Sequence, residues 1–291
     1  MTADGRPLDG ATAVFTGASS GIGRAAAEEL GRRGARVAVV GRNADRTRAV
    51  AASIENADAF VADFASLSDV RRVADELLDR FERIDVLANN AGGLVSHREQ
   101  TVDGHESTFQ VNHLAPFLLT TLLLPRFRKT AAAGHSVTVV STASVAARWG
   151  RLRLNDLDSR GRPWLGGWQA YGSAKTAVIL TTRELARRTE GSGITAYAFH
   201  PGFVTTSFGA GSWMLRLGNA LGFGGLGITP EAGAAPLVEL ASAAEPSAPS
   251  GTYFDGLVPH GRTSRAARDD SVATRLWGVS ESLIQPWLSR T

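Results

Sequence analysis

The sequence contains no cysteine among its 291 residues. That absence excludes a disulfide framework, zinc fingers, iron–sulfur clusters and a thiol nucleophile. Apolar runs of about 18 residues or more are also missing, so the sequence predicts no membrane-spanning helix. The first residues, MTADGRPLDG, lack the basic start and apolar core of a signal peptide, and we therefore expect a cytoplasmic protein.

Lysine is nearly absent as well. Lys129 and Lys175 are the only lysines among 31 basic residues, which leaves 29 arginines against 28 acids. Because so few groups titrate above neutrality, a net charge of only +3 persists to high pH and produces the pI of about 9.8. The charges are interspersed rather than clustered, so the sequence does not predict a nucleic-acid-binding surface.

Short apolar runs alternate with longer helical patterns, as is typical of repeated βαβ units and a parallel sheet. The expected strands are residues 11–17, 35–41, 59–64, 84–92, 136–144 and 194–202. The expected helices are 24–33, 44–55, 67–82 (capped by Ser66), 114–127 and 171–190. The sequence thus predicts an α/β fold, a single-domain Rossmann fold with a doubly wound parallel β-sheet of about seven strands and helices on both faces.

This single domain is expected to span residues 1–291. Its first part, 11–144, is mainly the expected cofactor-binding half, and 145–291 carries the catalytic helix and the substrate site. Two irregular stretches in the second half are interpreted as an insert at 145–169 and a lid at 207–227.

A glycine-rich turn, TGASSGIG, joins the first strand to the first helix. Glycines let the backbone approach a pyrophosphate, and a helix N-terminus supplies N–H donors to it. The spacing is TGxxxGxG rather than GxGxxG, and a turn of this kind can also serve packing alone. The residues expected to bind the cofactor here are Gly17, Ser19, Ser20, Gly21, Ile22 and Gly23.

The end of the second strand bears on the choice between NADP and NAD. A carboxylate there would bind the ribose 2′-hydroxyl of NAD, but this chain has Gly41 followed by Arg42 and Asn43. A guanidinium suits a 2′-phosphate, so we expect NADP(H) to be preferred over NAD(H). The alternative is that Arg42 is simply a solvated arginine.

Three further segments stand at strand ends or on a helix: NNAG at 89–92, STAS at 141–144 and YGSAK at 171–175. Together with TGASSGIG, VNHLAPF and HPGFVTT, they occur in an order that resembles the short-chain dehydrogenase/reductase family. The resemblance is strong over residues 11–208. VNHLAPFLLT and the long insert before the tyrosine resemble the retinol-dehydrogenase-like branch of that family.

The expected catalytic pair is Tyr171 and Lys175, which lie four residues apart and so share one helix face. A neighbouring ammonium is expected to lower the pKa of the tyrosine, which could then exchange a proton with a carbonyl or alcohol oxygen. A lone YxxxK pair is usually a surface pair, but here one of only two lysines falls on it.

The resemblance implies three supporting roles. Lys175 would also hold the nicotinamide ribose, Ser144 would hydrogen-bond the substrate oxygen, and Asn112 would hold a water that relays protons to Lys175. Ser141 and Thr142 lie near the same strand end, and the spacing between Ser144 and the following Gly-Arg pair favours Ser144.

The resemblance implies more cofactor contacts, with no metal. These contacts are Asp63, Phe64, Asn90, Ala91, Gly92, Tyr171, Lys175, Pro201, Gly202, Val204 and Thr206. Asp63 could instead be a simple turn carboxylate. The six histidines show no metal-ligand spacing, and His113 and His200 are expected to be structural.

Bulky apolar residues gather where the family builds its substrate pocket. They are Trp149, Trp164, Trp168, Phe203, Phe208, Trp213, Met214 and Leu215. Such a lining favours a hydrophobic substrate, although packing of the insert onto the body would give the same composition. Segment 212–223 is expected to be an amphipathic lid, and its single cation makes membrane contact a weaker interpretation.

The resulting functional hypothesis is an NADP(H)-dependent oxidoreductase acting on a hydrophobic carbonyl or alcohol. One alternative is a relative that uses the cofactor for epimerisation, dehydration or rearrangement, and another is an NADP-binding sensor without turnover. The apolar helices at 114–124 and 176–185 match the surfaces that the family uses for pairing, so the resemblance implies a homodimer or homotetramer, though a buried core would give the same pattern. The arginine- and alanine-rich composition is typical of a GC-rich bacterium.

Overall fold

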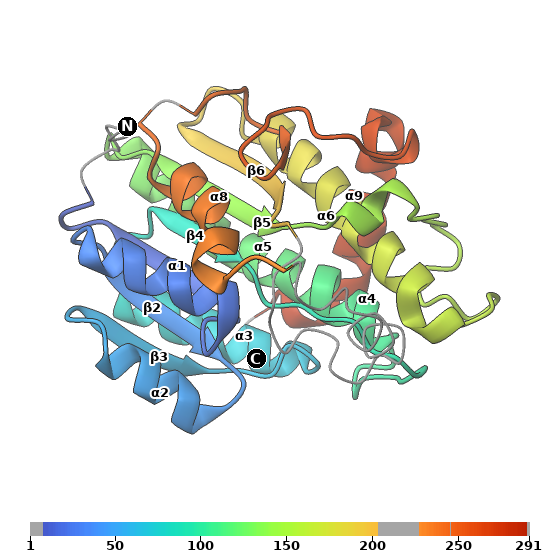
Figure 1. Ribbon diagram of the computed structural model, residues 1–291, viewed down its shortest axis with the longest axis horizontal. Coiled ribbons are helices and arrows are strands. Elements are labelled where there is room, and N and C mark those ends of the chain that lie inside the picture. The colour runs from blue at the N-terminus through green and yellow to red at the C-terminus, as the bar shows by residue number, and fades with distance from the viewer. Residues whose placement is uncertain (1–7, 203–226, 245, 290–291) are drawn as a thin grey trace.

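Seven short strands pair side by side in one parallel sheet (Figure 1). The computed structural model describes residues 8–202, 227–244 and 246–289. The strands are β1 (Thr12–Thr16), β2 (Arg36–Gly41), β3 (Ala57–Val61), β4 (Val86–Asn89), β5 (Val137–Thr142), β6 (Ile194–His200) and β7 (Tyr253–Asp255). Their order is β3-β2-β1-β4-β5-β6-β7, which confirms the predicted doubly wound sheet.

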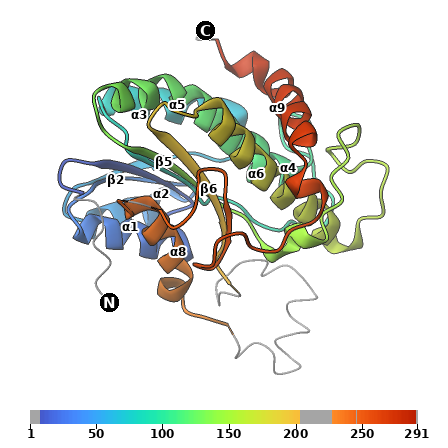
Figure 2. The ribbon, with the colours of Figure 1, turned by 90° about the horizontal axis from the view of Figure 1, so that it is seen from above.

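Helices cover both faces of the sheet (Figure 2). One face carries α1 (Gly21–Arg32), α2 (Ala44–Ala52) and α8 (Pro230–Ser242), and the other carries α3 (Leu67–Arg80), α5 (Ala115–Ala132) and α6 (Trp168–Arg188). Shorter turns are α4 (Ser107–Phe109), η1 (Gln110–Leu114), η2 (Val145–Arg148), η3 (Leu165–Gly167), η5 (Ala266–Arg268) and η6 (Gln285–Trp287). Because both faces are covered, the central strands β1 and β4 are wholly buried and mostly apolar.

The predicted element boundaries needed small corrections. The helix expected at 24–33 begins at Gly21, inside the glycine motif, and the helix expected to open at Tyr171 begins at Trp168. Gly167, with φ of 81°, ends the preceding turn in a left-handed conformation and sets that earlier start. Ser66 caps α3 as predicted, since its hydroxyl accepts the N–H of Asp69 at 3.2 Å.

A last helix, α9 (Asp270–Ile284), packs on the outer side of α6 (Figure 2). Its Trp277 meets Phe117 of α5 edge-on, with ring centroids 4.8 Å apart. Leu118, Leu119 and Leu180, within the stretches expected to pair subunits, are completely buried in this single chain. The apolar pattern at 114–124 and 176–185 is therefore explained by core packing and gives no evidence for an oligomer.

Among the described residues, the helices are all too short or too polar to cross a membrane. The amphipathic lid expected at 212–223 lies outside the described residues.

We predict that α9 is anchored by one buried hydrogen bond. Ser280 is fully buried, and its hydroxyl lies 2.8 Å from Nε2 of His113, which is itself buried. Ser280→Ala leaves that ring nitrogen without a partner, so the free energy of unfolding should fall by about 1–3 kcal/mol. Urea denaturation measures the change.

The matched control is Ser282→Ala on the same helix. Ser282 is exposed and bonds only the carbonyl of Gly278, so its removal should change stability by about 0.5 kcal/mol or less. Equal losses for both variants would show that the contact with His113 does not anchor α9.

Candidate active site

Three predicted catalytic side chains converge at the carboxyl end of β5. Ser144 follows that strand as the N-cap of η2, and Tyr171 and Lys175 lie one turn apart on α6. The Tyr171 and Ser144 hydroxyls are hydrogen-bonded. The Lys175 ammonium lies 5.6 Å from the centroid of the Tyr171 ring, and both residues are buried.

Burial controls the protonation of this pair. It raises the pKa of Tyr171 above its usual range, and the hydrogen bond from Ser144 only partly offsets the shift. Burial lowers the pKa of Lys175 to about 7. The net shift is opposite to the lowering expected from the neighbouring ammonium, because desolvation of the phenolate dominates. At neutral pH Tyr171 carries its proton.

The three hydroxyls near the end of β5 have different partners. Ser144 contacts Tyr171, whereas the hydroxyl of Thr142 donates to Oδ1 of Asn90 at 3.1 Å. Ser141 lines a small cavity between the sheet and α5 and α6. Of the three, Ser144 is therefore placed to act with the tyrosine, as the sequence spacing favours.

Asn112 lies in a π-helical turn, η1, that the sequence analysis did not anticipate. Its Nδ2 donates to the carbonyls of Gly93 and Thr108, each at 2.7 Å, and its Oδ1 accepts the Gly93 N–H at 3.1 Å. Gly92 is exposed, and a Cβ there would lie 2.5 Å from Oδ1 of Asn112 and 3.3 Å from Nζ of Lys175. A glycine is required to keep this approach open.

The glycine turn fits an anionic phosphate group. Gly17 has a φ of 65°, and a Cβ there would lie 2.8 Å from Cα of Ala91. At Gly23 a Cβ would lie 2.6 Å from the carbonyl oxygen of Gly17. Helix α1 begins at Gly21 with no side-chain hydrogen bond at its N-cap, Ser20, and no acid in its first turn. Its first N–H groups therefore remain available to an anion.

Asn90 connects this turn with Lys175. Its Nδ2 donates to the carbonyl of Thr16 at 3.2 Å, and its Oδ1 accepts the Thr142 hydroxyl. The carbonyl of Thr142 in turn accepts a hydrogen bond from Nζ of Lys175 at 2.7 Å. The Thr16 hydroxyl oxygen accepts the N–H groups of Asn90 and Ala91, each at 3.0 Å.

Arg42 is exposed at the end of β2 and has no ion-pair partner among the described residues. Gly41 beside it is buried, and a Cβ there would lie 2.5 Å from Oγ1 of Thr47, so a carboxylate would not fit without movement. Asn43 caps α2 by accepting the Arg46 N–H at 2.9 Å. A free guanidinium thus stands where the sequence analysis expects the 2′-phosphate.

The other predicted cofactor residues divide into three groups. Asp63 accepts the Ala65 N–H at 2.9 Å and so forms a turn, while Phe64 is buried in the core rather than open to a ligand. Pro201 and Gly202 follow β6 at the same edge of the sheet as the catalytic residues. Val204 and Thr206 lie outside the described residues, as do Phe203, Phe208 and Trp213, which were expected to contact the substrate.

The tryptophans before the catalytic tyrosine differ in exposure. Trp149 is 72% exposed, and Trp168 meets the Tyr171 ring edge-on with centroids 6.2 Å apart. Trp164 instead fastens the insert, because its indole N–H donates to the carbonyl of Ser96 at 2.8 Å. Packing therefore explains Trp164, and Trp149 and Trp168 remain candidates for substrate contact.

One residue that organises the insert was missed. Arg162 is buried and donates to the carbonyl of Arg151 at 2.6 Å and to Ser173, two residues after the catalytic tyrosine, at 3.4 Å. With 29 arginines in the chain, no sequence signal distinguishes this one.

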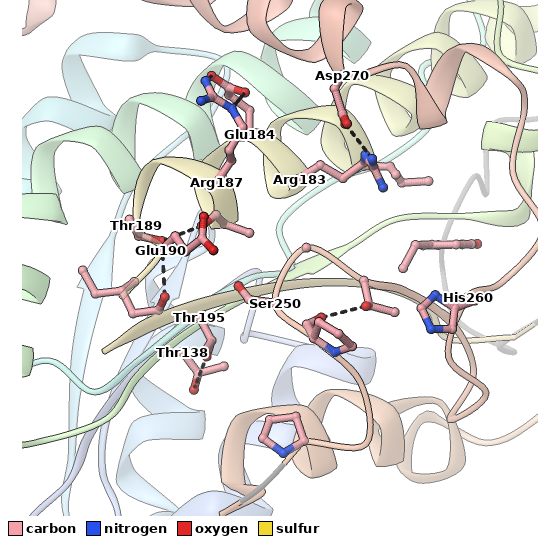
Figure 3. Close-up of a pocket in the computed structure, with 18 of the residues that line it drawn as sticks. Thr138, Arg183, Glu184, Arg187, Thr189, Glu190, Thr195, Ser250, His260 and Asp270 are labelled. Carbon is pink, nitrogen blue, oxygen red and sulfur yellow. Dashed lines mark hydrogen bonds and ion pairs between the residues drawn. The ribbon is translucent and has the colours of Figure 1, made fainter. Parts of the chain in front are cut away.

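A separate groove of about 1200 Å³ lies along the second half of α6 and the beginnings of β5 and β6 (Figure 3). Ion pairs join Arg183 to Asp270 and Glu184 to Arg187 along its wall. Neither Tyr171 nor Lys175 lines it. The described residues also contain no cluster of three or more His, Asp or Glu side chains that could hold a metal.

Comparisons with known proteins agree with this geometry. A family model described as short chain dehydrogenase matches residues 11–153. "Putative daunorubicin C-13 ketoreductase DnrU" from Streptomyces sp. (strain C5) is 40% identical over 287 residues, covering 95% of this chain and 93% of the relative. Human retinol dehydrogenase 13 is 37% identical over 288 residues, covering 95% and 85%.

A solved Pseudomonas aeruginosa structure, the RhlG/NADP active-site complex, is similar with a TM-score of 0.67 and 28% identity. The match covers 85% of this chain and 95% of that one. Sheet order, motif positions and relatives agree, and the chain belongs to the short-chain dehydrogenase/reductase family, in its retinol-dehydrogenase-like branch.

Proposed function

We propose that this protein is an NADP(H)-dependent oxidoreductase that interconverts the carbonyl and alcohol forms of a hydrophobic small molecule. The observation that carries the proposal is the convergence of Ser144, Tyr171 and Lys175 at the carboxyl end of β5. Membership of an oxidoreductase family supports the reaction class. The choice of NADP(H) and of a hydrophobic substrate rests on individual residues of the site.

Tyr171 is the proposed general acid. When bound, NADPH supplies a hydride to the carbonyl carbon. Tyr171 donates its phenolic proton to the carbonyl oxygen, and the Ser144 hydroxyl stabilises the charge that develops there. Because burial raises the pKa of Tyr171, its proton is present at neutral pH, which suits reduction of a carbonyl.

Lys175 is the proposed proton reservoir behind the tyrosine. Its pKa of about 7 lets the amine gain and lose a proton near neutrality, as a group that restores the Tyr171 proton must. By family resemblance Asn112 would hold the connecting water. The π-helical turn and the bonds to Gly93 keep that asparagine fixed beside Gly92.

The cofactor would lie across the carboxyl edge of the sheet. The free N–H groups of α1 would bind the pyrophosphate, and Arg42 would pair with the 2′-phosphate of NADP. The NADP complex of a similar short-chain dehydrogenase fold supports this choice.

The proposed substrate is a bulky, hydrophobic ketone, aldehyde or alcohol. The relatives named as a daunorubicin ketoreductase and a retinol dehydrogenase support a ketone or alcohol as the reacting group. Within the described residues, exposed Trp149 and the Trp168 ring beside Tyr171 provide aromatic surface for such a molecule.

We predict that Tyr171→Phe removes hydride transfer and leaves cofactor binding intact. Loss of the general acid should lower kcat by about 10²- to 10⁴-fold, because the ring is kept and only the proton donor is lost. Nicotinamide absorbance follows turnover with an aromatic ketone, and energy transfer from tryptophan to NADPH reports the dissociation constant.

Tyr197→Phe is the control. Tyr197 is a buried tyrosine of β6, and it packs on the face of the sheet opposite to α6, which carries Tyr171. It should keep near-normal turnover. Normal turnover by Tyr171→Phe would refute the proposed mechanism.

We also predict that Arg42→Ala selectively weakens NADPH. Loss of charge-assisted hydrogen bonds to the 2′-phosphate should raise the NADPH dissociation constant about 10- to 100-fold and leave that of NADH nearly unchanged. Paired fluorescence titrations with the two cofactors measure both constants.

Arg48→Ala removes the same charge from an exposed position of α2 and should affect neither cofactor. A loss shared equally by NADPH and NADH in Arg42→Ala would contradict the assignment.

A further inference from the structure

A small cavity of about 40 Å³ lies between the sheet, α5, α6 and α9. Its lining includes Asn112 together with Asn89 of β4, Thr120 of α5, Ser141 of β5 and Trp277 of α9. Tyr171 and Lys175 do not line it. The cavity is thus distinct from the catalytic cluster, although it shares Asn112 with it.

Asn89 presents an unused acceptor in this cavity. The Thr120 hydroxyl donates to the carbonyl of Pro116 at 2.7 Å, so its oxygen can only accept from Asn89, whose Nδ2 lies 2.9 Å away. That bond fixes the orientation of the amide. Oδ1 of Asn89 then has no hydrogen-bond partner among the described residues, although the side chain is 92% buried (8% exposed).

Trp277 presents an unused donor. Its indole N–H is buried and has no hydrogen-bond partner in the described part of the chain. Phe117 packs edge-on against the ring, and the guanidinium of Arg188 lies 4.7 Å from the ring centroid. One acceptor and one donor, each without a protein partner, therefore belong to side chains that line the same cavity.

Leaving such groups without partners costs about 1–3 kcal/mol each, and buried water normally removes that cost. A cavity of about 40 Å³ has room for about three or four waters, at roughly 10–15 Å³ for each. A buried water needs about two to four polar partners, and Oδ1 of Asn89 and the Trp277 N–H supply two.

We propose that the cavity is an internal hydration site in which ordered water accepts a hydrogen bond from the Trp277 indole and donates one to Oδ1 of Asn89. Through this water, Trp277 of α9 is a positioning residue for Asn112. The positioning role of Trp277 rests on the proposed function, whereas the hydration site does not.

The link to Asn112 follows from how α9 meets the π-helical turn. Asn112 lines the cavity, and the next residue, His113, shares a hydrogen bond with Ser280 of α9. The Asn112 amide is bonded to Gly93 and Thr108, and its residue faces the cavity beside the contact of His113 with α9.

A crystal structure of the full chain, at a resolution that places ordered water, tests the hydration site without any substrate. We expect density within about 3 Å of both Nε1 of Trp277 and Oδ1 of Asn89. A dry cavity, or an amide turned so that both Asn89 atoms are satisfied by protein, would overturn the proposal.

Trp277→Phe tests the positioning role, because it keeps an aromatic ring and removes the N–H. In its crystal structure the water should be lost or displaced, and the Asn112 side chain should shift.

Trp287→Phe is the matched control, since Trp287 of η6 does not line the cavity and should leave water and Asn112 in place. If Trp277→Phe does not fold, Asn89→Ala removes the acceptor instead. An unmoved Asn112 after loss of the water would refute the positioning role.

Kinetics separate this inference from the proposed function. In an active enzyme, Trp277→Phe should lower kcat about tenfold, as for a lost buried hydrogen bond, with KM and NADPH affinity unchanged. Wild-type protein that binds NADPH but never transfers hydride would refute the proposed function alone, because the density and the Asn112 position are read without turnover. Unchanged kcat in an active enzyme would refute the positioning role.

Discussion

A single side-chain amide, that of Asn90, joins the two parts of the candidate active site. One end of the amide bonds the strand that enters the glycine turn, at Thr16, and the other accepts the Thr142 hydroxyl. The Thr142 carbonyl holds Lys175. Parallel strands bring these residues to one edge of the sheet. The Asn90 amide then holds Thr16 and Thr142 together, because it is hydrogen-bonded to both. Moving the turn would therefore move the lysine.

Burial gives this arrangement its chemical character. A lysine in water would remain charged and a tyrosine protonated across the neutral range. Here burial brings the pKa of Lys175 to about 7 and raises that of Tyr171, so the lysine changes its protonation near neutrality while the tyrosine keeps a proton to donate. The scarcity of lysine is consistent with this use. An arginine stays protonated and could not pass a proton on.

The sequence was sufficient for the sheet and for much of the site. Apolar runs and turn residues located six strands. A seventh strand was expected, but its position, Tyr253–Asp255, was not predicted. The motifs located Tyr171 and Lys175 because four-residue spacing on a helix fixes their common face. Local patterns also located the Ser66 cap, whose partner lies three residues away.

Properties that depend on distant packing could not be predicted. Nothing near Asn112 in the sequence signals a π-helical turn, since that turn is held by contacts with Gly93 and α9. The apolar pattern of α5 was compatible with a subunit interface until its packing against α3 and the sheet was seen. The direction of the Tyr171 pKa shift needed the degree of burial, which spacing does not contain.

The most direct test of the account is a single turnover. Protein loaded with NADPH, or with NADPH deuterated at the transferring carbon, is mixed rapidly with a hydrophobic aromatic ketone in ordinary and heavy water, and nicotinamide absorbance is followed. Absorbance should fall, and its fall should be slowed by deuterium in the cofactor and also by heavy water, because hydride and the Tyr171 proton both move. Bound NADPH whose absorbance persists with every ketone, or decays without either isotope effect, would contradict it.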